Sequence, residues 1–149
     1  MVRVVRPGGR IVITTWLPRG PIFEAGTILR GAMADLAPQG PPGEPPPWGD
    51  ASRVRALFES RGASVTTTTR SIAFEAASPE AWFAEQEANH PVWRSVRRSL
   101  AEHPARWDDL RARSVAALRA GNQAPGAFRG LSDYLVVSAT VSEGVTARR

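Results

Sequence analysis

Few side chains in this sequence are of the types that carry acid–base, nucleophilic or metal chemistry. Cysteine is absent, which removes thiol catalysis, disulfides and thiolate-ligated metals. The two histidines, His90 and His103, both precede a proline, and neither belongs to a metal-binding motif such as H-E-x-x-H. His90 is a candidate general base, because imidazole titrates near neutral pH and can take a proton from a reacting group. The alternative interpretation places both histidines at helix boundaries on the surface.

The carboxylates and hydroxyls offer no further catalytic pattern. Asp108 and Asp109 occupy adjacent positions of an expected helix, so their side chains face different directions and cannot form a paired site. The serines lack the G-x-S-x-G context of a nucleophile elbow. We therefore expect no metal site, and His90 is the only catalytic candidate.

Three aromatic residues are candidates for binding a substrate: Trp16, Phe23 and Trp48. Trp16 follows an expected buried strand, and ligands of open α/β sheets bind beyond the carboxyl ends of the strands. Phe23 and Trp48 belong to the segments that come next, a helix and a proline-rich lid. The alternative for Trp16 is an aromatic residue at the rim that covers the core.

The first of the elements that must position these residues begins with the P-G-G tripeptide at 7–9. Proline fixes φ and the glycines permit positive φ, so the tripeptide predicts a turn. The β-branched run Ile11–Thr15 is apolar at consecutive positions, which predicts a strand buried on both faces. Upstream, Met1–Arg6 carries basic residues typical of a helix C-terminus.

Periodicity and proline content divide the middle of the chain. Helices are expected at Ile22–Leu36 and at Asp50–Gly62, the second with an Asp N-cap and a left-handed Gly at its C-terminal end. Between them Ala37–Gly49 holds six prolines and predicts a stiff surface loop or lid. The alternative for this loop is a ligand of an SH3- or WW-type domain.

The rest of the chain predicts further strands around a helical region. Strands are expected at Ser64–Ile72 and Tyr134–Thr140, and three helices at about 78–121. The aromatic residues of these helices are more often core than pocket, and they are Trp82, Phe83, Trp93 and Trp107.

Together these segments resemble the C-terminal half of class I, Rossmann-like S-adenosylmethionine-dependent methyltransferases. In that family a helix ending in R-x-L-[KR]-P-G-G leads into the fifth, apolar strand, and R-V-V-R-P-G-G-R-I-V-I-T-T-W at 3–16 is similar to this form. Trp48-Gly49-Asp50 is similar to the start of the helix before the sixth strand. S-R-G-A at 60–63 and D-Y-L-V-V-S-A-T at 133–140 then follow in the family's order.

The resemblance implies an α/β fold, the C-terminal part of a Rossmann-like methyltransferase sheet with a helical insertion. Its three strands would form one sheet in which the last strand is antiparallel and central. Residues 1–141 would form this partial domain, with the insertion at about 78–121. Residues 142–149 would be a frayed tail.

The activity that the resemblance implies is methyl transfer to a small-molecule substrate, with S-adenosylmethionine as cofactor. The sequence lacks the glycine-rich turn and the ribose-binding acid that such a cofactor needs, so no cofactor-binding residue is assigned. We expect a truncated enzyme, or a reading frame begun at an internal Met, that binds the cofactor weakly or not at all. The alternatives are a non-catalytic binding or regulatory module and a remnant that pairs with another chain.

The net charge of +5 comes from arginine alone. A nucleic-acid binder would account for it, but the only dense group, Arg94, Arg97 and Arg98, carries no interleaved aromatic platform. Solvated helix faces are the favoured interpretation, with no nucleic-acid partner. No apolar run reaches the length of a membrane span and no signal peptide is recognisable, so we expect no membrane partner and a cytoplasmic location.

A last expectation concerns association. In the family's order the strand at Arg10–Thr15 has a neighbour that this sequence does not supply, so one strand edge would be open. Open edges expose unpaired backbone groups and template pairing with another chain. We therefore expect self-association or a partner chain at this edge.

Overall fold

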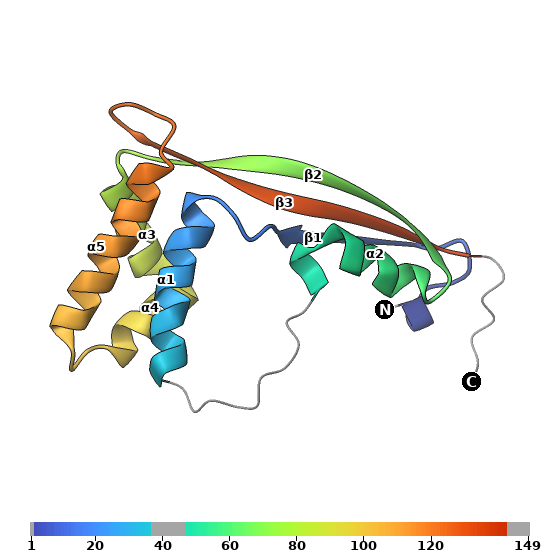
Figure 1. Ribbon diagram of the computed structural model, residues 1–149, viewed down its shortest axis with the longest axis horizontal. Helices are drawn as coiled ribbons and strands as arrows, with labels where there is room; N and C mark the ends of the chain where they lie inside the picture. The colour runs from blue at the N-terminus through green and yellow to red at the C-terminus, as the bar shows by residue number, and fades with distance from the viewer. Residues whose placement is uncertain (1, 37–46, 143–149) are drawn as a thin grey trace. The chain divides into compact units, whose positions relative to one another are not determined.

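The computed structural model describes residues 2–36 and 47–142, which form an α/β fold of five α-helices and one three-stranded antiparallel sheet (Figure 1). Two short 3-10 helices complete the secondary structure of these residues. In chain order the elements are η1 (Val2–Val4), β1 (Arg10–Trp16), α1 (Pro21–Leu36), η2 (Pro47–Gly49), α2 (Ala51–Glu59), β2 (Ala63–Ala76), α3 (Pro79–Asn89), α4 (Pro91–Ser99), α5 (Pro104–Ala120) and β3 (Phe128–Val141).

The strand order of the sheet is β1-β3-β2. Strand β1 pairs antiparallel with β3 in a register that runs from Arg10 opposite Thr140 to Trp16 opposite Tyr134. The expectation that the last strand is antiparallel and central is therefore confirmed. Strands β2 and β3 are longer than expected, at 14 residues each.

The P-G-G tripeptide forms the expected turn before β1. Gly8 has a φ of 73°, in the left-handed region that favours glycine. A Cβ on Gly9 would lie 2.5 Å from Cγ1 of Val5 and 2.7 Å from the carbonyl oxygen of Arg6. The turn also extends the ladder with β3, because the Gly8 N–H donates to the Val141 carbonyl and the Val141 N–H donates to the Gly9 carbonyl. Both glycines are thus required by geometry.

The described chain divides into two compact units. The sheet unit comprises residues 2–18, 47–71 and 133–142, and contains β1, α2 and most of β2 and β3. The helical unit comprises residues 19–36 and 72–132, and contains α1, α3, α4 and α5 with the remaining ends of β2 and β3.

In the sheet unit, α2 covers one face of the strands. Its buried residues Val54 and Phe58 lie in one apolar cluster with Ile11 of β1, Val65 of β2 and Val137 of β3. In β1 the less exposed positions alternate from Ile11 onward, and in β3 the buried positions recur at every second residue from Leu135 to Val141, as the pleat requires. This alternation is typical of antiparallel sheets with one covered face.

The prediction that Ile11–Thr15 is buried on both faces is wrong. Ile11 is buried, but 58% of Val12 and 55% of Trp16 are exposed on the opposite face. The physical reason is that α2 is the one α-helix among the described residues of this unit, so only one face receives a cover.

The expected N-cap of α2 is confirmed, whereas the helix ends at Glu59, before the expected Gly62. The Asp50 carboxylate accepts from the backbone N–H groups of Ser52, at 2.8 Å, and of Arg53, at 3.1 Å. Hydrogen bonds from the Ser52 hydroxyl and the Arg53 N–H lower the pKa of Asp50 below its ordinary value of 3.8. Gly62, two residues beyond the C-cap Ser60, has a φ of 75°.

In the helical unit, the four helices enclose an aromatic core. Phe83 is fully buried, with its ring centroid 4.9 Å from that of Trp93 and 6.0 Å from that of Trp107. Trp82 contacts Trp93 and Phe128 in the same cluster. The interpretation of these aromatic residues as core is confirmed.

Three expectations on the ends of elements have other outcomes. The segment Met1–Arg6 was expected to end a helix, whereas Val2–Val4 forms one turn of 3-10 helix. Most of the proline-rich stretch, at 37–46, and most of the expected tail, at 143–149, lie outside the described residues.

Candidate functional site

Trp16 lies at the end of β1, beyond which a ligand was expected. Its ring meets that of Tyr134 edge to face, with the centroids 5.9 Å apart, and the two residues are opposite each other in the β1–β3 register. The side chain of Trp16 is more than half exposed. The pair forms an apolar shelf on the uncovered face of the sheet unit, which can stack against a flat ligand.

Trp48 lies beside the same end of β1. It belongs to η2, which contacts β1, and a Cβ on Gly49 would lie 3.2 Å from Cδ of Pro18. Its own side chain is half-buried and packs against the core of the sheet unit. The structure thus brings the segments that carry Trp16 and Trp48 together at one end of β1, but the Trp16 side chain lies on the uncovered face and that of Trp48 packs against the core on the covered face.

Phe23 belongs to the helical unit, in the first turn of α1. The guanidinium carbon of Arg30 lies 5.0 Å from its ring centroid, a cation–π contact within the helix. The hypothesis that Phe23 lines one acceptor site with Trp16 and Trp48 stays a prediction.

His90 lies at the junction between two helices. It ends α3 and is the N-cap of α4, where its Nδ1 accepts from the Val92 N–H at 3.2 Å. An Nδ1 that accepts a hydrogen bond leaves the proton of a neutral imidazole on Nε2. This position accounts for His90 as an exposed capping residue, and its role as a general base stays a prediction.

His103 likewise precedes a helix, α5, but makes no side-chain capping hydrogen bond. Among the described residues, no three side chains of the His, Cys, Asp or Glu type gather closely enough to hold a metal ion.

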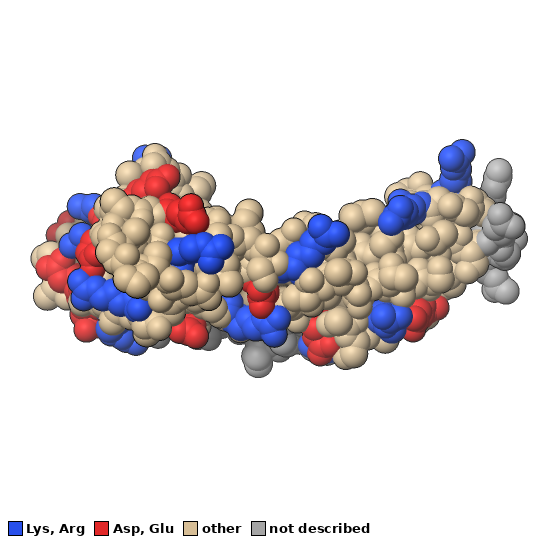
Figure 2. Space-filling model, turned by 90° about the horizontal axis from the view of Figure 1, so that it is seen from above, with Lys and Arg blue, Asp and Glu red and all other residues tan. Residues whose placement is uncertain are grey.

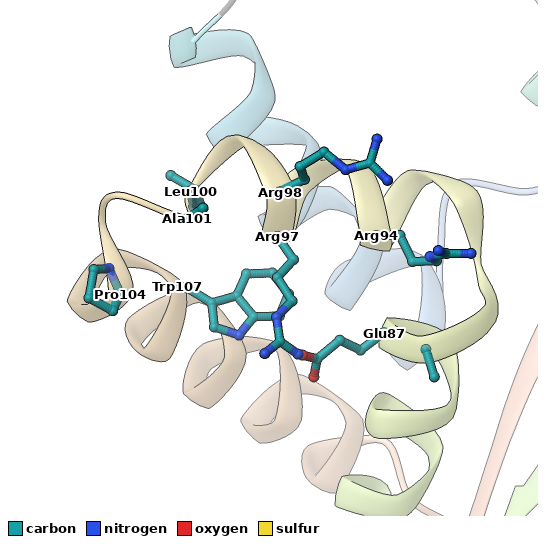
Figure 3. Close-up of a pocket in the computed structure, with 9 residues that line it drawn as sticks. Glu87, Arg94, Arg97, Arg98, Leu100, Ala101, Pro104 and Trp107 are labelled. Atoms are coloured by element: carbon teal, nitrogen blue, oxygen red, sulfur yellow. The ribbon is translucent and has the colours of Figure 1, made fainter.

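The helical unit also holds a groove of about 540 Å³, bounded by α3, α4 and α5 (Figure 3). We call it the arginine groove, because Arg94, Arg97 and Arg98 of α4 line it. Glu87 of α3 forms an ion pair with the Arg97 guanidinium. The guanidinium carbon of Arg97 also lies 6.0 Å from the ring centroid of Trp107 in α5. Figure 3 shows the Arg97 side chain crossing the indole toward the Glu87 carboxylate.

The three arginines form the densest basic group in the sequence, but the sequence alone did not predict this groove. Their density at 94–98 was the available signal. The tryptophan that completes the groove follows Arg97 by ten positions and belongs to another helix. Only the packing of α3 against both α4 and α5 brings these groups together.

Elsewhere the charges are mixed. Figure 2 shows acidic and basic side chains lying among one another on the face that it presents. None of the helices at 2–36 and 47–142 combines the length and the apolar character needed to cross a bilayer.

Neither a protein family nor a curated protein matches this chain.

Proposed function

We propose that this chain is the acceptor-side, C-terminal half of a class I S-adenosylmethionine-dependent methyltransferase that acts on a small molecule. The observation that carries the proposal is the strand order β1-β3-β2, with β1 entered through the P-G-G turn. The resemblance assigns these strands as the family's fifth, last and sixth, and it expects the antiparallel last strand between the other two. The topology that the resemblance implies includes this order, so the observed order supports the proposal.

The strand order discriminates because local rules favour another one. Consecutive strands are neighbours in about two-thirds of cases, which makes a simple meander with β2 in the centre the default. Here β3 lies between β1 and β2, so these two consecutive strands are not neighbours. A stretch of 51 residues separates β2 from β3. Those residues form α3, α4 and α5, which corresponds to the helical insertion that the resemblance implies.

The chemistry that these residues can supply is acceptor binding. Trp16 and Tyr134 offer an apolar shelf at the end of β1, and the half-buried Trp48 lies on the adjoining segment. Such surfaces bind an apolar acceptor and exclude water from it.

The 149 residues do not fit S-adenosylmethionine by themselves, since they contain neither a glycine-rich turn of the G-x-G-x-x-G type nor an acid placed to bind ribose hydroxyls. The groups that hold the cofactor would therefore come from a polypeptide segment outside this sequence.

A second candidate, a binding module that works with another chain, is favoured by the position of β1. This strand lies at the edge of the sheet, where its outer backbone groups have no strand partner among the described residues. The two candidates differ in where the cofactor-binding half is encoded. In the first it belongs to the same gene, and in the second to another.

Two measurements test the proposal. Titration calorimetry of this chain with S-adenosylmethionine should give no saturable binding, and a micromolar affinity would contradict the assignment to the half without the cofactor site. The genomic sequence upstream should then encode a glycine-rich turn in frame. Expressed together with that upstream segment, the chain should bind S-adenosylmethionine at micromolar concentration. Failure to bind in this co-expression experiment would reject the methyltransferase proposal.

A further inference from the structure

We propose that the arginine groove binds a small amphiphilic anion, an apolar chain or ring that carries one carboxylate. The proposal concerns the helical unit alone and does not depend on the proposed methyl transfer. It is argued from the charges, the lining and the size of the groove.

The groove carries an excess of positive charge. Arg94, Arg97 and Arg98 are spaced i, i+3 and i+4, which places them on one face of α4. Glu87 is the only acid among the described residues that line the groove, and it pairs with Arg97. Within the described chain, the guanidinium groups of Arg94 and Arg98 make no ion pair or hydrogen bond. Two guanidinium groups therefore remain for an anion from solution.

The helix dipole accounts for only part of this arrangement. Arg97 and Arg98 lie in the last turn of α4, where cations are favoured. Arg94 lies one turn earlier, and its like-charge pairing with Arg98 at i, i+4 is unfavourable. A bound carboxylate between the two side chains would offset that repulsion, and guanidinium groups can bind it in bidentate geometry.

The floor of the groove is apolar. Its solvent-exposed apolar lining comes from Ala88, Ala101 and Pro104, while Leu100 and Trp107 border the groove as buried residues. A ligand of charge alone would leave this surface wet. An apolar chain or ring laid on it, with its carboxylate toward Arg94 and Arg98, would use both parts of the groove.

The size of the groove and the burial of the Trp107 indole argue against nucleic acid as the ligand. A volume of about 540 Å³ lies within the range typical of small-molecule sites, about 300 to 1,000 Å³. Single-stranded nucleic acid needs an exposed aromatic face on which bases stack. Trp107 offers none, because it is buried and Arg97 lies over its ring.

The experiment uses decanoate as the probe, followed by titration calorimetry and by NMR of the tryptophan indole N–H signals. Decanoate should bind saturably and shift one indole signal. Decyltrimethylammonium, with the same chain and the opposite charge, and inorganic phosphate, with charge and no chain, should both bind at least about tenfold more weakly. If either matches decanoate, the proposal is overturned.

Two variants locate the binding. R94Q/R98Q changes exposed side chains and should weaken decanoate binding by about tenfold or more. Its matched control, R3Q/R70Q, removes the same charge from exposed arginines of the sheet unit and should leave binding unchanged. A88L places a larger apolar side chain in the groove without altering its charge and should also weaken binding. Equal affinities in the wild type and in both groove variants, or an equal loss in R3Q/R70Q, would overturn the proposal.

Discussion

The helical unit and the sheet unit bury their apolar residues to different extents. In the helical unit, aromatic side chains from α3, α4, α5 and β3 pack against one another, and Phe83 among them is fully buried. In the sheet unit, α2 covers one face of β1, while Val12 and Trp16 remain more than half exposed on the other. The edge of β1 is also without a strand partner in the described chain.

This difference indicates which unit needs a neighbour. Four helices that share one core can satisfy their apolar faces within the unit. A strand covered on one face and at an edge leaves both apolar surface and backbone groups for another element. The sheet unit is thus the part of the chain expected to associate, and the helical unit the part expected to carry the stability.

The largest expected effect breaks the core of the helical unit. Phe83→Ala removes a fully buried ring that contacts Trp93 and Trp107, and such truncations cost about 3–5 kcal/mol. The matched truncation in the sheet unit, Trp16→Ala, removes a ring that is more than half exposed and should cost far less. Urea unfolding followed by far-UV circular dichroism measures both. Equal losses of stability would contradict the comparison.

Two glycine substitutions should have opposite signs in the two units. Gly9→Ala places a Cβ 2.7 Å from the Arg6 carbonyl oxygen, an overlap that should cost about 1–3 kcal/mol. Gly31→Ala in α1 meets nothing within 4 Å and should stabilise the helix by about 0.5–1 kcal/mol. The free energies of unfolding from urea titrations decide the matter. A neutral Gly9→Ala would show that the turn can relax.

A charged substitution tests association through the sheet unit. We expect the purified chain to sediment as a dimer or larger species, because β1 offers an open edge beside apolar surface. Val12→Lys places a charge on the exposed face of β1 and should shift the chain toward monomer, with folding stability changed by no more than about 0.5 kcal/mol.

The control for association lies in the helical unit. Val92→Lys alters an exposed valine of α4 and should leave the sedimentation profile as it is in the wild type. A wild-type chain that sediments as a stable monomer at high concentration would refute the expectation.

Much of the sheet could be predicted from the sequence, because its signals are local. The P-G-G turn, the Asp50 cap and Gly62 each require a particular backbone conformation, and each is observed. The central position of β3 followed from the resemblance rather than from any local rule. The exposure of Val12 could not be predicted, since a run of consecutive apolar residues does not reveal whether both faces receive a cover.

The candidate sites were harder to predict for a related reason. Its position after an expected strand identified Trp16 as a ligand candidate. The ring that pairs with it, that of Tyr134, is distant in sequence and is brought near by strand pairing. The arginine groove needs three helices packed together before its charge and its indole meet. His90 had an imidazole suited to chemistry, and the structure uses it as a helix cap.

The smallest expected effect is a pH dependence of the helix caps. Asp50 caps α2 of the sheet unit, and its pKa is lowered below 3.8 by hydrogen bonds from Ser52 and Arg53. Its stabilisation is therefore complete above the unfolded value and is lost as the pH falls through the lower, folded value. Ser78 caps α3 of the helical unit by accepting from the Ala81 N–H. Its hydroxyl does not titrate, but the pKa of the Glu80 carboxyl is lowered by the backbone N–H of Glu80 and also by a hydrogen bond from this hydroxyl.

Asp50→Asn keeps an acceptor oxygen at the cap but cannot ionise. The wild type should be more stable than this variant at pH 5, and the difference should shrink as the pH falls below the ordinary value of 3.8 and through the lower, folded pKa of Asp50. Urea titrations from pH 5 downward measure the difference, in which contributions from the other carboxylates cancel. Ser78→Ala should lower stability by about 1 kcal/mol, and part of this difference should also fall at acid pH, because the Ser78 hydroxyl contributes to the lowered pKa of Glu80. If the Asp50→Asn difference stays constant as the pH falls, the cap does not depend on the charge of Asp50, and the stability of α2 comes from its packing against the sheet.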